Sequence, residues 1–192
     1  SSRCEEAGIA LTLVSPAVLE TLASSVAPRG PVAVVSIPSV KELQPIDTVV
    51  LWDISDPGNA GTIIRTAAAF EFRVAATVGS VDLWSPKVVR SAVGGHFRTQ
   101  LTSALPADVS VLTKAGLRPV VAAASAPRRV ETALATPEPV ALIVGNETHG
   151  VPSDVGQMTG VDVVSLPMPG GAESLNAAIA AGILMYLRLT SR

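Results

Sequence analysis

Three glycine-rich stretches of the sequence carry polar side chains that could bind a ligand. They are residues 56–61, 145–150 and 166–173. Glycine lets a backbone approach a ligand closely. Two charged residues, Arg65 shortly after the first stretch and Glu147 within the second, could add hydrogen bonds or an ion pair. The stretches therefore predict a binding site that combines close backbone contact with one cation and one carboxylate.

The first stretch is expected to lead into a helix that begins at Gly61. Asn59 can cap this helix, and Arg65 lies one turn beyond Gly61 on the same helix face. That position would aim the positive charge of Arg65 at the stretch. A plain capped helix with a surface arginine is the competing interpretation, and these residues alone leave both open.

The second and third stretches have equally ordinary alternatives. Glu147 could accept hydrogen bonds from a ligand or anchor an arginine such as Arg65, or it could lie in a solvated turn. His149 could act as a base, although a single loop histidine without a partner is more often incidental. Ser174 could contact a substrate or simply cap the helix that follows, because serine is a preferred capping residue.

Several classes of protein chemistry lack their residues in this sequence. One cysteine, Cys4, and two distant histidines are too few for a zinc site. The sequence has neither a Walker-type phosphate loop nor the glycine fingerprint of dinucleotide-binding enzymes. The net charge of -2 argues against a protein that coats nucleic acid with positive charge, so any RNA contact must be local. Lys87, Arg90 and Arg98 form one basic group, which could equally be a solvated face.

From residue 48 onward, apolar segments alternate with helical patterns. Strands are predicted at Thr48–Trp52, Arg73–Val78, Pro119–Ala124, Val140–Val144 and Val161–Leu166, and helices at Gly61–Phe70, Pro86–Val93, Ala107–Ala115 and Ser174–Arg192. This alternation predicts an α/β fold with a mostly parallel sheet and helices on both faces. Ligands bind such sheets at the carboxyl ends of the strands, where all three glycine-rich stretches fall.

The N-terminal part reads as a separate small α/β piece. Ile9–Val14 and Val32–Ile37 are predicted as buried strands, and Pro16–Val26 between them as a helix entered through Ser15. Residues 38–47 contain two prolines and mixed charges without clear periodicity, which is typical of a linker. We therefore expect a domain boundary in this region.

Composition narrows the class of protein further. A chain of 192 residues with 48% hydrophobic but only 3% aromatic residues must build its core from aliphatic side chains. Its longest apolar run, Ala177 to Leu187, is far shorter than the ~20 residues of a membrane helix. With a single cysteine and no secretory signal pattern in the sequence, we expect a soluble, cytoplasmic protein.

Taken together, the three stretches resemble the motifs of the SpoU (TrmH-like) family of SPOUT ribose 2'-O-methyltransferases. The matching residues stand in the family's order and spacing: Asn59-x-Gly61-x-x-x-Arg65, then Gly145-Asn146-Glu147-x-x-Gly150, then Leu166-Pro167-Met168 followed by Ser174-Leu175-Asn176. The resemblance covers residues 47–190. Thr148-His149 stands where the family usually has Gly-Arg or Gly-Glu, so the second stretch could differ in shape.

The resemblance implies an architecture that periodicity does not predict. In the family, the C-terminal chain threads a trefoil knot, and two copies dimerise through the knotted region. Residues 1–38 would be the C-terminal part of a small α/β RNA-binding domain, 39–47 a linker, and 48–192 the SPOUT catalytic domain. The implied partners are RNA and a second copy of the chain, with no membrane.

The resemblance also assigns roles to single residues. S-adenosyl-L-methionine would be the cofactor, with no metal, and its contacts would be Ala124, Ser125, Gly145, Leu166 and Leu175. The catalytic group would consist of Asn59, Arg65, Glu147, Ser174 and Asn176.

The implied reaction is methyl transfer to a ribose 2'-hydroxyl of RNA, and 23S ribosomal RNA is the expected substrate. Because a guanidinium stays protonated in proteins, we expect Arg65 to stabilise the developing alkoxide or hold a phosphate. The alternatives are a transfer-RNA ribose methyltransferase, a base-methylating enzyme of the same fold, and a noncatalytic RNA-binding protein.

Overall fold

The computed structural model describes residues 2–23, 30–39, 42–124, 126 and 128–191. Its internal contacts divide the chain into two units, Ser1–Pro38 and Ser39–Arg192. Each unit is described by itself. No helix among the described residues is long and apolar enough to span a lipid bilayer.

The first unit contains two short helices, α1 (Ser2–Glu6) and α2 (Pro16–Leu22). The predicted entry into α2 is confirmed, because the Ser15 hydroxyl accepts a hydrogen bond of 3.4 Å from the Val18 amide. The helix ends at Leu22, earlier than predicted. Residues 24–29, which include the predicted end of the helix, lie outside the described residues.

The two strands predicted in the first unit are wrong. Ile9–Val14 and Val32–Ile37 have irregular backbone, and their apolar side chains are exposed, with Leu13 at 92% and Val34 at 99%. A strand is stable only when a neighbouring strand satisfies its backbone groups. The described residues of this unit supply no such neighbour. Apolar sequence alone therefore did not make these segments strands.

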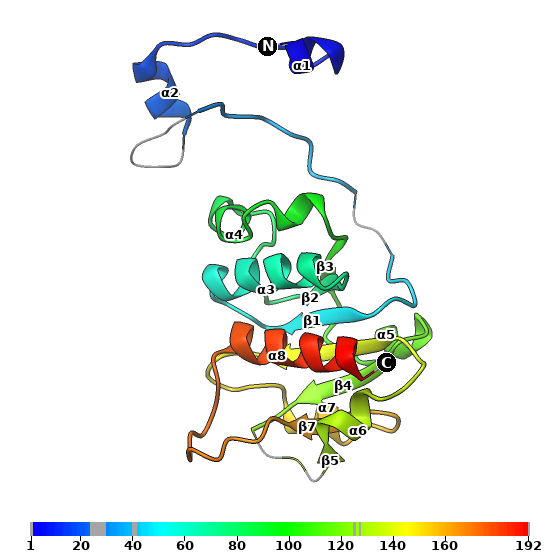
Figure 1. Cartoon of the computed structure of the whole chain (residues 1–192). Coiled ribbons are helices and arrows are strands. Elements are labelled where there is room, and N and C mark those ends of the chain that lie inside the picture. The colour runs from blue at the N-terminus through cyan, green and yellow to red at the C-terminus, as the bar shows by residue number, and fades with distance from the viewer. Residues whose placement is uncertain (1, 24–29, 40–41, 125, 127, 192) are drawn as a thin grey trace. The chain divides into compact units, whose positions relative to one another are not determined.

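The second unit is built on a sheet that contains seven strands in the described part of the chain. In chain order they are β1 (Thr48–Trp52), β2 (Arg73–Thr77), β3 (Leu101–Leu105), β4 (Arg118–Ala122), β5 (Arg128–Arg129), β6 (Val140–Gly145) and β7 (Asp162–Ser165). Their spatial order is β3-β2-β1-β6-β4-β7-β5, and every described pair is parallel (Figure 1). The predicted parallel sheet is confirmed.

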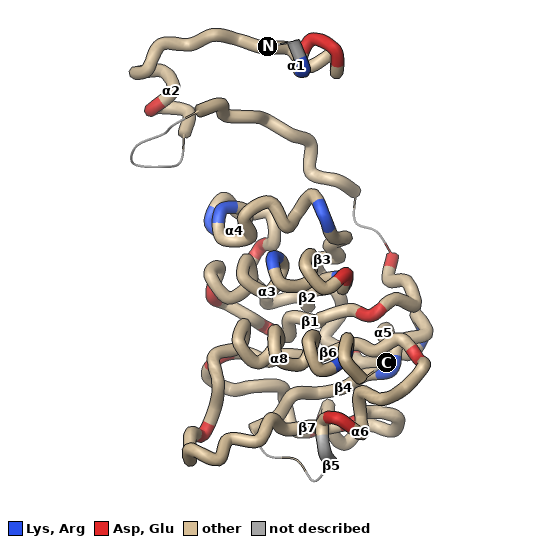
Figure 2. Tube along the Cα trace, viewed as in Figure 1, with Lys and Arg blue, Asp and Glu red and all other residues tan. Residues whose placement is uncertain are grey.

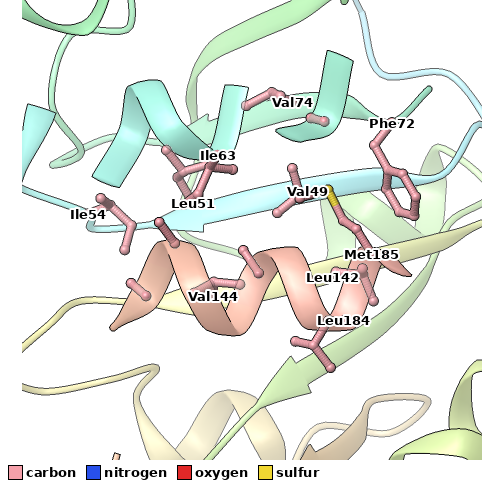
Figure 3. Packing of buried hydrophobic residues seen from close by; sticks show 14 of the residues in the cluster. Val49, Leu51, Ile54, Ile63, Phe72, Val74, Leu142, Val144, Leu184 and Met185 are labelled. Carbon is pink, nitrogen blue, oxygen red and sulfur yellow. The ribbon is translucent and has the colours of Figure 1, made fainter. Parts of the chain in front are cut away.

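Helices cover both faces of this sheet, as predicted. They are α3 (Pro57–Ala69), α4 (Pro86–Ser91), α5 (Ser110–Lys114), α6 (Val130–Leu134), α7 (Ser153–Gly156) and α8 (Ala177–Thr190), with a 3-10 turn, η1 (Gly95–Phe97). Val49 and Leu51 of β1 pack with α3, α6 and α8 on one face, while Val50 packs with α5 and α7 on the other. Figure 3 shows the first of these cores between α3 and α8.

The strand order brings the three glycine-rich stretches to one edge of the sheet. β1 and β6 are neighbours in register, with Trp52 opposite Gly145, so the first and second stretches leave adjacent strand ends. β7 lies beyond β4, and its carboxyl end leads into the third stretch. Parallel strands point the same way, so all three stretches meet at the carboxyl edge. The trefoil knot implied by the resemblance stays a prediction.

A buried ion pair ties the ends of the second unit together. Arg188, near the end of α8, has no exposed surface and donates to Asp47, just before β1, with its Nε 2.8 Å from Oδ2. Its remaining N–H groups reach the carbonyls of Leu134, Thr136 and Glu138. Every donor of the guanidinium is therefore used. The network fixes the last helix to the first strand and to the connection between α6 and β6.

Candidate cofactor cavity and catalytic cluster

A cavity of about 560 Å³ opens at the carboxyl ends of β4, β6 and β7. Its walls are small and aliphatic near the sheet, and polar where the second stretch and the residues just before α8 cover it. Four of the five predicted cofactor contacts line it: Ala124, Gly145, Leu166 and Leu175. The fifth, Ser125, lies outside the described residues.

Gly145 is the last residue of β6, and a tight turn follows it. A Cβ atom built on it would lie 2.2 Å from the carbonyl carbon of Gly150 and 2.3 Å from the Val151 nitrogen, so a side chain cannot fit. The Gly150 amide donates to the Asn146 carbonyl at 2.8 Å, and Gly150 has a φ of 68°. The residue type at Gly145 is therefore set by a backbone-to-backbone contact, which brings main-chain groups to the cavity.

Asn146 shapes this turn with its side chain, a role that the sequence reasoning missed. Its Nδ2 donates to the Asp53 carbonyl at 2.8 Å, which links the end of β6 to the end of β1. Its Oδ1 accepts from the amides of Thr148 and His149 at 2.8 and 3.2 Å. Because only the backbones of these two residues are used, the turn does not depend on their side chains. The turn-forming preference of asparagine after a strand was the available signal.

Glu147, Asn59 and Asn176 form a chain of side-chain hydrogen bonds. The Asn59 Nδ2 donates to Glu147 Oε1 at 2.9 Å, and the Asn176 Nδ2 donates to Asn59 Oδ1 at 2.9 Å. Glu147 also accepts from the Ser55 hydroxyl at 3.3 Å and from the amides of Ser55 and Asp56 at 3.5 and 3.4 Å. These contacts join the loops that follow β1, β6 and β7 into one cluster.

The charge of Glu147 is stabilised by this setting. Partial burial raises the pKa of its carboxyl, but the hydrogen bonds from Asn59, its own amide, Ser55 and Asp56 outweigh that effect and hold the pKa below its ordinary value. Glu147 is therefore an ionised acceptor at neutral pH. It organises the cluster rather than serving as a proton donor.

Two predicted helix starts are corrected by the structure. The α3 helix begins at Pro57 rather than Gly61, and its cap is Asp56, whose Oδ1 accepts from the Asn59 amide at 2.7 Å. Proline at the first helical position and aspartate before it are the preferred arrangement. The side chain of Asn59 is thereby free to bind Glu147 and Asn176.

The α8 helix begins at Ala177, and Asn176 caps it rather than Ser174. The Asn176 Oδ1 accepts from the amides of Ala178 and Ile179 at 2.9 and 3.2 Å. One asparagine therefore fixes the helix with its oxygen and Asn59 with its nitrogen. Ser174 lies in the loop on the wall of the cavity, and its hydroxyl has no hydrogen-bond partner within the described part of the chain.

Arg65 is not anchored by Glu147, so that interpretation of the sequence is wrong. The side chain of Arg65 is exposed on α3, and among the described residues it makes neither a hydrogen bond nor an ion pair. Gly61, one turn before it, instead allows α3 and α4 to touch, since a Cβ there would lie 1.8 Å from Ser91 Oγ. The guanidinium of Arg65 is thus available to a partner outside the chain.

The cavity and the cluster suit a small polar ligand next to a second reactant. A volume of about 560 Å³ is that of an ordinary small-molecule site, and aliphatic walls with a few polar groups at the mouth are typical of such sites. Apolar walls can hold a flat ring, and the main chain around Gly145 can supply its hydrogen bonds. An adenosyl sulfonium therefore fits the residues present.

Comparison with known proteins agrees with this geometry. Residues 47–186 match the SpoU rRNA Methylase family. The chain is 34% identical over 183 residues to a 23S rRNA (guanosine(2553)-2'-O)-methyltransferase, RlmP, from Bacillus subtilis, covering 94% of this chain and 73% of the relative.

Two solved structures share the architecture. An AdoMet-bound rRNA methyltransferase from Sinorhizobium meliloti superposes with a TM-score of 0.71 at 30% identity, covering 78% of this chain and 60% of that one. An RNA 2'-O ribose methyltransferase gives a TM-score of 0.75 at 28% identity, covering 99% of this chain and 75% of that one. The chain therefore belongs to the SpoU family of S-adenosylmethionine-dependent RNA methyltransferases.

Proposed function

We propose that this chain transfers a methyl group from S-adenosylmethionine to a ribose 2'-hydroxyl of ribosomal RNA, with 23S rRNA as the substrate. The observation that carries the proposal is the hydrogen-bonded chain of Glu147, Asn59 and Asn176 beside the cavity. It holds together the three loops that would surround the cofactor and the reacting sugar. The Bacillus subtilis relative, named for 23S rRNA 2'-O-methylation, supports the choice of RNA.

The cofactor would lie in the cavity against Ala124, Gly145, Leu166 and Leu175. When bound, S-adenosylmethionine supplies a methyl group activated by a positive sulfur. The aliphatic walls would exclude water from this group, and the tight turn at Gly145 would present main-chain groups to the adenosine or the amino-acid part. Ser125 belongs to the same proposed contact set.

The five proposed catalytic residues would have two kinds of role, contact with the RNA and positioning of the site. The 2'-oxygen must be held in line with the methyl group, and the negative charge that develops as its proton leaves must be stabilised. Arg65 and Ser174 have donors with no partner in the described chain, so they are the groups proposed to contact the RNA. Glu147, Asn59 and Asn176 use their side chains on one another and are proposed as positioning residues.

Calorimetric titration with S-adenosylmethionine tests the proposal, using the wild type and Leu175→Arg. Leu175 lines the cavity, so a long charged side chain there should abolish binding while the fold is kept. Met158→Arg is the matched control, because Met158 is also an exposed apolar residue but does not line the cavity. No binding by the wild type, or equal binding by Leu175→Arg, would contradict the proposed site.

The homodimer expected from the resemblance is part of the same proposal. The outer face of α8 exposes Ile179, Ile183, Tyr186 and Leu189, an apolar stripe on an otherwise buried helix. Such a stripe is typical of a subunit interface. Ile183→Glu should convert a dimer to a monomer in sedimentation velocity, whereas Met158→Glu should leave it a dimer. A wild type that sediments as a monomer would refute the dimer.

Three further assignments rest on the family resemblance. They are a trefoil knot formed by the C-terminal chain, an RNA-binding role for residues 1–38 joined by a linker at 39–47, and a cytoplasmic location. The division of the chain after Pro38 is compatible with the second. Residues 42–47 are held against the catalytic domain, since Leu43 packs on its core and the Glu42 carbonyl accepts from Gln100.

A further inference from the structure

The segment that follows α4 presents an aromatic ring to solvent. Phe97, in the 3-10 turn η1, is 82% exposed, and Val93 just before the turn is 67% exposed. The chain contains only 3% aromatic residues, and burial of such a ring on folding would contribute to stability. An exposed phenylalanine beside another exposed apolar residue is therefore a candidate contact surface.

The backbone that carries the ring is anchored on both sides, by a buried histidine and a half-buried threonine. His96 is buried, its Nε2 lies 2.7 Å from the Leu83 carbonyl, and its ring packs against Trp84 at 5.0 Å. The Thr99 hydroxyl donates to the Phe72 carbonyl at 2.5 Å. Phe97 and Arg98 lie between these two anchors and are directed outward by them. The backbone of this segment is therefore preorganised, which lowers the entropy cost of binding.

The backbone before the ring is strained. Val93 has a φ of 47° and Gly94 a φ of 80°. A β-branched residue in the left-handed region is a rare outlier that costs free energy and is found mainly where the conformation serves a function. The strained turn sets the direction in which η1 leaves α4.

The segment that carries the exposed ring is basic. Between Asp82 and Asp108 the sequence contains Lys87, Arg90 and Arg98 and no acidic residue. Lys87 and Arg98 are exposed, and Figure 2 shows basic residues along α4 and in the segment that follows it. η1 also rests on α3 beside Arg65, because a Cβ on Gly95 would lie 3.2 Å from the Arg65 Cα. The turn that carries the ring therefore packs on the helix that carries the exposed Arg65.

We infer that Phe97 is a stacking platform for an unpaired base of the RNA substrate, with Lys87 and Arg98 contacting the phosphates on either side. The inference rests on the proposed function and extends it to a specific contact. Aromatic side chains in a basic setting bind single-stranded RNA by stacking with its bases, and the local charge complements the backbone. The overall charge of -2 makes such a local patch the available route to RNA.

Fluorescence anisotropy with a labelled single-stranded oligoadenylate tests the inference on the full chain. Phe97→Ala and Phe97→Leu should weaken binding by roughly 5- to 100-fold, the effect of losing one stacked base, whereas Phe97→Tyr should bind as the wild type. An abasic oligonucleotide of the same length should bind wild type and Phe97→Ala equally. Met158→Ala, which removes an exposed apolar side chain elsewhere, should change nothing.

Several outcomes would overturn the inference while leaving the proposed function intact. They are unchanged binding by Phe97→Ala, no binding of oligoadenylate by the wild type, and wild-type affinity in Phe97→Leu, which would indicate apolar contact without stacking. A switch of Phe97→Ala from dimer to monomer in sedimentation velocity would assign the ring to a subunit interface instead. Titration with S-adenosylmethionine distinguishes a failure of this inference from a failure of the proposed function, because Phe97→Ala should keep wild-type cofactor affinity.

Discussion

The two asparagines of the site each do two tasks with one side chain. Asn176 caps α8 through its oxygen and binds Asn59 through its nitrogen, and Asn59 passes the contact on to Glu147. Aspartate could cap a helix in the same way, but it has no donor when ionised and could not make the donated hydrogen bonds to Asn59 and Glu147. An amide is therefore required at both positions, and ligand-binding loops are linked to the starts of two helices.

The protonation of Glu147 should control the hydrogen-bonded chain that it forms with Asn59 and Asn176. Hydrogen bonds lower the pKa of the Glu147 carboxyl in the folded state. Their contribution to folding stability is fully present above the pKa of the unfolded state and is lost as the pH falls through the lower pKa of the folded state. We expect the affinity for S-adenosylmethionine to fall in that acid range. Glu147→Gln should bind roughly fivefold more weakly at neutral pH, and its affinity should not change across the same range.

Asp108→Asn is the matched control for this titration. The hydrogen bonds from Ser110 lower the pKa of Asp108 as well, but this carboxylate lies beside α5, away from the cavity. Its substitution should preserve the wild-type pH profile of cofactor affinity. An acid loss that persists in Glu147→Gln would assign the titration to another group.

Arg65→Lys tests whether the planar guanidinium matters beyond its charge. Lysine keeps the charge but cannot form the paired hydrogen bonds of arginine. We expect the rate of RNA methylation to fall by roughly 100-fold, in the range that loss of a transition-state donor produces, with cofactor affinity unchanged. Full activity would show that a positive charge alone suffices at this position.

Residue types were easier to predict than residue contacts. The sequence motifs pointed to Asn59, Glu147 and Asn176, and the structure brings these three together. The contact between Glu147 and Arg65 does not form, because Glu147 binds Asn59 and the loop after β1 while Arg65 is exposed on α3. Which residue of a helix faces a given carboxylate depends on where the helix begins, and sequence preferences predict that start only to within about a turn.

At the scale of elements, the turn after β6 is the most constrained part of the site. Gly145→Ala should abolish cofactor binding, because the added methyl group would lie 2.2 Å from the Gly150 carbonyl carbon and force the turn open. Gly170→Ala is the matched control, since nothing lies within 4 Å of its added methyl group. Calorimetric titration of both variants decides the point, and wild-type affinity in Gly145→Ala would contradict the described turn.

The sequence pattern predicted the buried strands well, and the half-buried strand and the shortest helices poorly. Buried apolar runs mark five of the described strands, and each starts within about one residue of its prediction: β1, β2, β4, β6 and β7. β3 was missed because Leu101–Leu105 is a half-buried edge strand with an irregular register and polar residues between its apolar ones. α6 and α7 were missed because helices of five and four residues carry almost no periodic signal.

At the scale of the whole molecule, the Arg188 and Asp47 pair closes the catalytic domain. Removing one member of a buried ion pair leaves the other unpaired at a cost of about 3–5 kcal/mol. Arg188→Leu should therefore lower the free energy of unfolding, measured by chemical denaturation, by about that amount. Arg118→Leu, which breaks the partly exposed pair with Asp162, should cost clearly less. Equal losses would contradict the special role of the buried pair.

The sequence pattern did not predict this ion pair, because its members are 141 residues apart and a single arginine in an apolar helix has many possible partners. The same limit applied to the cavity, whose walls come from three strands distant in sequence. Their meeting depends on strand order, which periodicity does not determine. The family resemblance predicted which residues meet at the cavity, because its motifs mark the three loops that the strand order brings together.

Mass spectrometry of RNA nucleosides tests the central claim most directly. Wild type and Leu175→Arg would be incubated with unmodified 23S rRNA, or with transfer RNA, and S-adenosylmethionine carrying a labelled methyl group. We predict a labelled 2'-O-methylnucleoside in 23S rRNA with the wild type and none with Leu175→Arg. Label on a base, label confined to transfer RNA, or no transfer by a wild type that binds the cofactor would contradict it.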